Sequence, residues 1–72
     1  MSNKTDLTEY SSQELSLNVF NDEYLYKSVR RFHKHDQLRD LVSEFFIFDD
    51  EQFDELCEDW DADQEEMEKE CG

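Results

Sequence analysis

Residues 36–60 read DQLRDLVSEFFIFDDEQFDELCEDW, and two apolar stripes in this stretch decide the fold. The first stripe consists of Leu38, Leu41, Val42 and Phe45. The second repeats the same i, i+3, i+4, i+7 spacing with Phe53, Leu56, Cys57 and Trp60. This spacing puts the apolar side chains on one face of an α-helix. The stretch therefore predicts two helices that pack face to face, with Trp60 buried against residues such as Leu41 or Phe45.

Polar residues that can cap helices stand at the start of each predicted helix. Asp49 and Gln52 match a capping box, in which each side chain accepts a hydrogen bond from the other residue's backbone N–H. Asp36 can cap the preceding helix. Asn21 or Asp22 can cap an earlier one. That earlier helix presents apolar residues at spacings of four and three, namely Leu25, Val29 and Phe32.

Residues 14–20 fit two structures. Apolar residues alternate with polar ones in this segment, at Leu15, Leu17 and Val19. This alternation is typical of a half-buried strand. However, Ser11 followed by Glu14 matches a helix capping box, so both alternatives stay open. The predicted fold class is mainly α: a small helical domain of about three helices, with or without one short N-terminal strand.

The length of 72 residues holds one domain at most. Residues 1–13 are polar and lack periodicity, so we expect a flexible N-terminal arm. Residues 14–62 should form a compact, mainly helical domain, and residues 63–72 a frayed acidic tail. A large net charge is also typical of disordered chains. The ten aromatic residues nevertheless favour a packed core.

Acidic residues dominate the composition, with 21 Asp or Glu against seven Lys or Arg and a net charge of −14. Solubility alone requires a net charge of only about 2 to 8 on a small domain. Residues 49–72 hold 13 of the acids and one base. On a helix, one face opposite the apolar stripe carries Glu51, Asp54, Glu55, Glu58, Asp61 and Glu65. We predict that this acidic face binds a basic protein partner.

Basic residues are concentrated in one segment of the chain, which holds Lys27, Arg30, Arg31, Lys34 and Arg39. We expect these side chains to pair with the acidic helix and stabilise the fold. A chain with this net charge is repelled by nucleic acids and by anionic membranes at long range. Direct binding to either is therefore not expected.

Residues that could support catalysis are scarce. Cys57 lies on an apolar stripe, where a thiol is buried and inert. The only glycine is terminal, so no glycine-rich loop can hold a phosphate. The pair His33 and His35 lacks the usual spacing of a structural zinc site. We expect the protein not to be an enzyme, and we expect no cofactor and no bound metal.

A calcium loop is the remaining metal-binding alternative. The first, third, fifth and twelfth positions of an EF-hand loop match Asp59, Asp61, Asp63 and Glu70. Gln64 occupies the sixth position, where glycine makes the sharp turn. A calcium-binding fragment is therefore kept as a third hypothesis.

The small size, the charge density, the acidic helical C-terminus and the interleaved aromatic residues resemble small phage-type DNA-mimic inhibitors of the anti-CRISPR and anti-restriction class. The resemblance implies an inhibitor that occupies the basic nucleic-acid-binding surface of a host defence or DNA-handling protein, such as a CRISPR effector or a restriction enzyme. Carboxylates would replace phosphates there. Exposed aromatic residues would anchor the complex, with Tyr24, Tyr26 and Phe48 as candidates.

An acidic adaptor or antitoxin-like protein that binds a basic partner is the alternative function.

The sequence contains no apolar run of about 20 residues and no signal-peptide pattern. We therefore expect the protein in the cytoplasm, which is the host cytoplasm if a phage encodes it.

Overall fold

The chain forms four helices and a two-stranded parallel sheet within residues 4–71. The structure is a computed structural model that describes the backbone of residues 4–71 and the side chains of residues 4–66. In chain order the elements are β1 (Thr5–Asp6), α1 (Glu14–Asn21), α2 (Glu23–Val29), α3 (His35–Phe45), β2 (Phe46–Ile47) and α4 (Asp50–Cys71). The predicted mainly helical class is confirmed, with four helices in place of about three.

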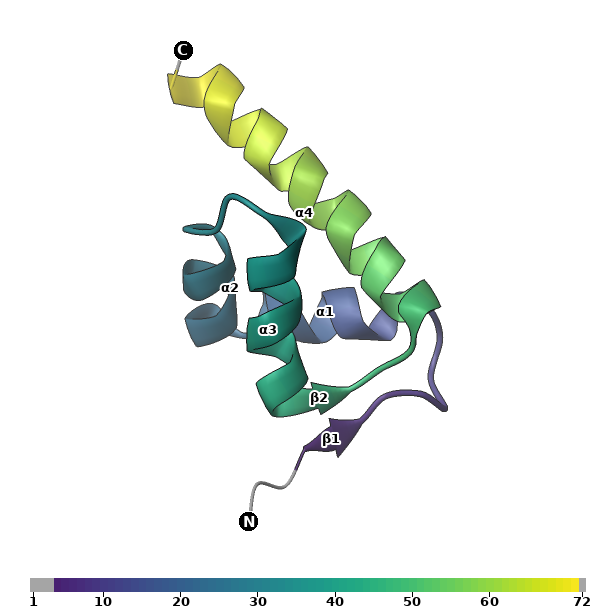
Figure 1. Cartoon of the computed structure of the whole chain (residues 1–72). Helices are drawn as coiled ribbons and strands as arrows, with labels where there is room; N and C mark the ends of the chain where they lie inside the picture. Colours follow the sequence, from purple (N-terminus) through teal and green to yellow (C-terminus); the bar gives the residue numbers. More distant parts are fainter. Residues whose placement is uncertain (1–3, 72) are drawn as a thin grey trace.

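Helix α4 is the longest element and gives the molecule its elongated shape. It runs along one side of the group formed by α1, α2 and α3, and its C-terminal half extends beyond them (Figure 1). The principal dimensions of 42 × 24 × 20 Å reflect this extension. A frayed tail was expected from residue 63, but the helix continues to Cys71. Residue 72 lies outside the described residues.

The ambiguous segment at residues 14–20 is helical. Leu15 and Val19 are fully buried, whereas Leu17 is 51% exposed, so burial follows a spacing of four and not of two. The predicted box between Ser11 and Glu14 does not form as expected. The helix begins after Gln13, and the carbonyl of Ser11 accepts the Glu14 N–H in a turn.

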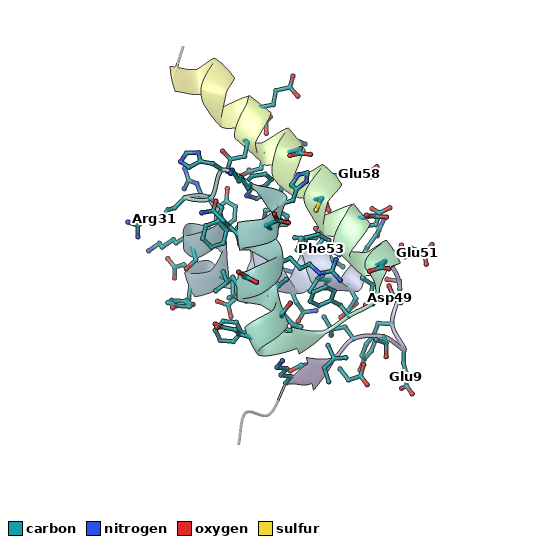
Figure 2. The ribbon with its side chains drawn as sticks, in the orientation of Figure 1. Glu9, Arg31, Asp49, Glu51, Phe53 and Glu58 are labelled. Atoms are coloured by element: carbon teal, nitrogen blue, oxygen red, sulfur yellow. The ribbon has the colours of Figure 1, made fainter. Side chains whose placement is uncertain are left out.

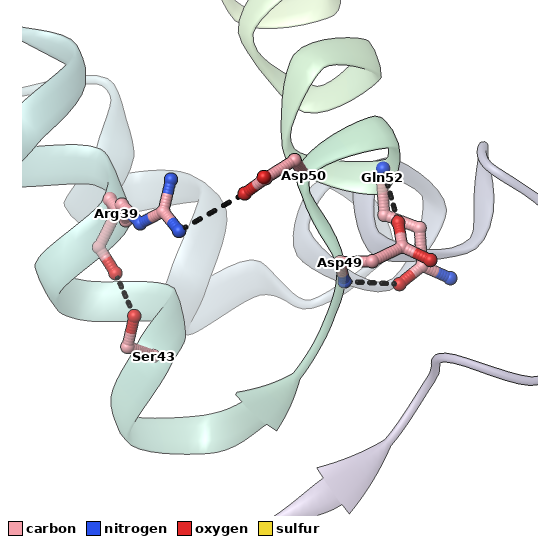
Figure 3. A network of polar contacts seen from close by, with 5 residues as sticks. All are labelled: Arg39, Ser43, Asp49, Asp50 and Gln52. Atoms are coloured by element: carbon pink, nitrogen blue, oxygen red, sulfur yellow. Dashed lines mark hydrogen bonds and ion pairs between the residues drawn. The ribbon is translucent and has the colours of Figure 1, made fainter.

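Two of the three predicted caps for the later helices are present. Asp22 caps α2, since its carboxylate accepts the Leu25 N–H at 3.1 Å. The capping box of α4 is complete: the Gln52 N–H donates to the Asp49 carboxylate at 2.9 Å, and the Asp49 N–H donates to the Gln52 side chain at 3.2 Å (Figure 3).

The cap predicted at Asp36 is wrong, because α3 begins one residue earlier, at His35. The side-chain oxygen of Gln37 accepts hydrogen bonds from the backbone N–H groups of His33 at 2.9 Å and Lys34 at 3.2 Å. These bonds fix the turn before the helix, so Asp36 falls within the first helical turn. Its negative charge is favourable there because the N-terminal end of a helix carries a partial positive charge.

The core lies between α4 and the other helices and contains most of both apolar stripes. Trp60 is only 4% exposed, as expected, and its indole N–H donates to the Val29 carbonyl at 2.7 Å. Its ring also meets the His35 ring edge to face, at 5.5 Å between centroids. Leu41 is half-buried against this core, whereas Phe45, expected inside it, is 40% exposed. Phe45 is the last residue of α3, where the chain turns into β2.

The N-terminal segment belongs to the packed domain and does not form the expected arm. Strand β1 pairs with β2, with Thr5 opposite Phe46. Leu7 is 2% exposed, and its N–H donates to the Ile47 carbonyl at 2.8 Å. The buried Gln52 side chain donates to the Leu7 carbonyl, so the start of the chain is attached to the start of α4. Residues 1–3 lie outside the described residues.

Candidate functional site

The predicted acidic face forms a row of carboxylates along α4. Five of its residues are exposed, namely Glu51, Asp54, Glu58, Asp61 and Glu65, and Glu55 is half-buried. Figure 2 shows Glu51 and Glu58 on the side of α4 that faces away from α2 and α3. From Glu51 to Glu65 the helix rises about 21 Å, which gives one carboxylate per roughly 4 Å of axis. One strand of B-DNA carries a phosphate charge per about 3.4 Å of axis.

Other carboxylates of α4 hold the helix against its neighbours. Asp59 accepts a hydrogen bond from the hydroxyl of Ser16, which is 3% exposed on α1. Asp63 accepts one from the Tyr26 hydroxyl on α2, at 3.1 and 3.2 Å to its two oxygens. Burial, and then the hydrogen bond to Asp63, raise the pKa of Tyr26. The inner carboxylates are therefore structural, and the outer row is separate from them.

Few basic side chains contact the described carboxylates of α4. Among the side chains of residues 4–66, Asp61 contacts His35 at 3.1 Å and Asp50 contacts Arg39 at 3.4 Å (Figure 3). Both pairs are exposed, and such pairs stabilise a protein by at most about 1 kcal/mol. Three pairs of like charges on the face stand four residues apart, namely Glu51 with Glu55, Asp54 with Glu58, and Asp61 with Glu65. Each costs roughly 0.2–0.5 kcal/mol. The face therefore destabilises the isolated helix.

The three predicted aromatic anchors have different environments. Tyr24 is 67% exposed and is available for contact. Tyr26 is half-buried, with its ring against Phe20 and its hydroxyl on α4, so it holds the fold together. Phe48 is half-buried and stacks on Phe53 at 5.8 Å. Only Tyr24 keeps the exposure that an anchor needs.

The sequence reasoning missed Phe45 as a surface residue. Its ring meets Tyr24 edge to face at 6.5 Å, so the two residues form an exposed aromatic pair on α2 and α3. Phe45 is the last residue of the predicted apolar stripe, and this terminal position could have indicated that its ring is exposed. Among the described residues, no hydrogen bond, ion pair or ring contact joins this pair to the acidic face.

The basic segment pairs with the acidic helix less than expected. Arg39 contacts Asp50 of α4, but Lys27 pairs with Glu23 of its own helix at 3.5 Å. Within residues 4–66, the side chains of Arg31 and Lys34 form no ion pair. The expectation of stabilising pairs with α4 is therefore correct for Arg39 and wrong for these three residues.

The segment that the calcium hypothesis requires as a loop is helical. Asp59, Asp61 and Asp63 lie within the continuous helix α4, where no 12-residue loop can wrap an ion. Their side chains instead contact Ser16, His35 and Tyr26 respectively. The side chain of Glu70, the fourth predicted ligand, lies outside the described residues. In the part of the chain with described side chains, no cluster of three or more metal-binding groups occurs.

Cys57 is half-buried beside the core, and burial together with the carboxylates of Asp61 and Asp54 raises its pKa to about 11. Because the thiolate is the reactive form, we expect slow alkylation by iodoacetamide at pH 8, and a rate that rises steadily with pH up to about 11. Mass spectrometry of a Cys71→Ser variant measures Cys57 alone. A rate that levels off below pH 9 would contradict the environment described for this thiol.

No family model, curated protein or solved structure matches the chain. In the part of the chain that the structure describes, none of the helices has the length and apolar character to span a membrane.

Proposed function

We propose that the chain is an acidic, DNA-mimicking inhibitor. In this proposal it occupies the basic nucleic-acid-binding surface of a host defence or DNA-handling protein, of the CRISPR effector or restriction enzyme type, in the cytoplasm of the host cell. The observation that supports it is the row of exposed carboxylates on the outer side of α4, from Glu51 to Glu65.

The spacing of this row supports mimicry of a phosphate backbone. Its axial density is close to that of one DNA strand, so several Lys or Arg side chains of a nucleic-acid groove can each meet a carboxylate. The row is also held in place before binding, because Trp60, Asp59 and Asp63 fix α4 to the other helices. A preorganised row loses less conformational entropy on binding than a disordered acidic tail.

The energies also favour a binding role over a purely solubilising one. Each charge-assisted hydrogen bond to a partner contributes about 1.5–3 kcal/mol. The repulsion along the free face amounts to only about 0.2–0.5 kcal/mol per pair. Three or four good contacts in a groove therefore exceed the cost of the row. The net charge of −14 also speeds the encounter with a basic surface.

Charge reversal on α4 tests the proposal. Asp54, Glu58 and Glu65 lie on one ridge of the helix and form no described bond, whereas Asp61 contacts His35. In this assay the immobilised chain is incubated with a bacterial lysate at low salt, and duplex DNA should then displace the captured target. We expect the triple variant with lysine at these three positions to lose essentially all capture and all inhibition of DNA binding by the target.

A matched control reverses Glu9, Asp40 and Glu44 to lysine, which makes the same change in net charge. All three are exposed and none lies on α4. This control should retain affinity within a few fold, with a slower association rate at low salt. Equal losses in both variants would indicate binding through bulk charge, as in an acidic adaptor. A captured target that duplex DNA cannot displace would contradict mimicry.

A further inference from the structure

Positive charge is concentrated in the last turn of α2 and in the turn between α2 and α3. We call Lys27, Arg30, Arg31 and Lys34 the basic loop, and all four are exposed. Figure 2 shows the side chain of Arg31 pointing away from the molecule, on the side opposite Glu51. The molecule is therefore bipolar, with carboxylates on the outer side of α4 and cations at the other side.

Contacts within the fold leave part of this charge available. Lys27 pairs with Glu23, but both side chains are largely exposed, at 70% and 85%. Arg30 lies over the Tyr26 ring, with 5.4 Å between its guanidinium carbon and the ring centroid. Arg31 and Lys34 form no ion pair with any described side chain. Helix α3 begins directly after Lys34, and the carboxylate of Asp36 in its first turn offsets the partial positive charge of the helix N-terminus.

Long-range repulsion prevents the basic loop from acting alone in the free protein. Residues 49–72 carry 13 acids and one base, while the rest of the chain carries eight acids and six bases. The strong negative field thus originates almost entirely from α4 and its ends. When the acidic face is docked on a basic groove, its six carboxylates are neutralised by the partner, which reduces the net charge from −14 to −8. The long-range repulsion is then weaker, and the positive potential of the basic loop acts on groups within about a Debye length of it.

We propose that the basic loop binds the phosphate backbone of nucleic acid that the target still holds beside the occupied groove. This inference rests on the proposed function, and it makes the protein a bridge that contacts both the target and its nucleic acid. Phosphate is the favoured anion for two reasons. A guanidinium such as that of Arg31 matches phosphate with two parallel hydrogen bonds. A target that binds DNA or RNA also holds phosphates next to the groove.

The test imitates the docked state by removing the charge of the acidic face. The background variant neutralises all six of its residues, with Glu51→Gln, Asp54→Asn, Glu55→Gln, Glu58→Gln, Asp61→Asn and Glu65→Gln. The probe is a 12-nucleotide single-stranded DNA, titrated at low salt and followed by amide chemical shifts, which detect weak binding. We expect saturable shifts confined to residues 27–36. Adding Arg31→Glu and Lys34→Glu should weaken this binding about tenfold or more, since two phosphate contacts are lost.

Two controls make every outcome informative. Reversal of Lys4 and Lys69 to glutamate changes the net charge equally outside the basic loop, and it should leave the oligonucleotide affinity within about twofold. Poly-glutamate of matched charge should bind much more weakly than the oligonucleotide. Equal binding of the two polyanions would overturn the assignment to phosphate. Shifts of the same amides with protein concentration alone would assign the loop to a second copy and also overturn it.

The oligonucleotide titration tests this inference separately from the proposed function. It requires no target protein, so it gives a result even if α4 captures no target. Absence of localised shifts in the background variant would exclude the basic loop as a phosphate site. Charge reversal on α4 would still decide the role of the acidic face.

Discussion

We expect Trp60→Ala to lower the free energy of unfolding by about 3–5 kcal/mol, because it removes the largest buried side chain and leaves a cavity. A domain of this size is stable by only roughly 4–10 kcal/mol. Trp60 is 4% exposed and its indole N–H occupies the Val29 carbonyl at 2.7 Å, so both packing and a buried hydrogen bond are lost. Urea unfolding followed by circular dichroism measures the loss.

One further variant isolates the contribution of the Trp60 hydrogen bond, and a second serves as a control at an exposed aromatic residue. Trp60→Phe keeps an aromatic ring but removes one of the two hydrogen bonds to the Val29 carbonyl, which still accepts the Phe32 N–H at 3.2 Å, so we expect a cost of about 0.5–1.5 kcal/mol. Tyr24→Ala removes an aromatic ring that is 67% exposed and should change stability by no more than about 0.5 kcal/mol. If Trp60→Ala unfolds at the same urea concentration as the parent, the indole does not support the core.

Gln52→Leu should produce the second largest loss, about 2–5 kcal/mol, although leucine has a similar size. Gln52 is 1% exposed and donates to the carbonyls of Leu7 and Ser11, at 3.1 Å for Ser11. The substitution removes one of two hydrogen bonds at each carbonyl, since Leu7 still accepts the Tyr10 N–H at 3.0 Å and Ser11 the Glu14 N–H at 3.1 Å; each loss costs about 0.5–1.5 kcal/mol. It also removes one half of the capping box with Asp49, which contributes roughly 0.5–2 kcal/mol.

Hydrogen exchange identifies where the structure opens in this variant. The Leu7 amide, bonded to the Ile47 carbonyl, should lose most of its protection, since Gln52 no longer holds the N-terminal segment. Gln13→Leu is the matched control, because Gln13 is exposed and its side chain does not cap α1. That control should stay within about 0.5 kcal/mol of the parent. Unchanged protection of Leu7 in Gln52→Leu would contradict the attachment.

Features that depend on neighbours in sequence were predictable in part. The box between Asp49 and Gln52 and the cap at Asp22 involve residues three apart and were predicted correctly. The equally local box between Ser11 and Glu14 and the cap at Asp36 did not form, because packing moved the starts of α1 and α3. The apolar stripe that ends at Trp60 was clear, because helical spacing fixes which side chains share a face. The outer carboxylates follow directly, since they occupy the opposite face of the same helix.

Features that depend on distant contacts were not predictable. Thr5 and Asp6 have an ordinary polar sequence, and they form a strand only because β2 lies beside them. Tyr26 looked like a free anchor, but its hydroxyl reaches Asp63, which is 37 residues away. The partners of the basic side chains depend on how the helices are placed around α4. No local pattern contains that information.

Parallel pairing of β1 with β2 has a consequence for how the protein is made on the ribosome. The first strand is synthesised about 40 residues before its partner, so it cannot pair until most of the chain has been translated. At about 5–20 residues per second, Leu7 stays without its final environment for roughly 2–8 seconds. Leu7 therefore reaches its buried environment only after residues 46–52 have been synthesised, so the N-terminal segment joins the fold late.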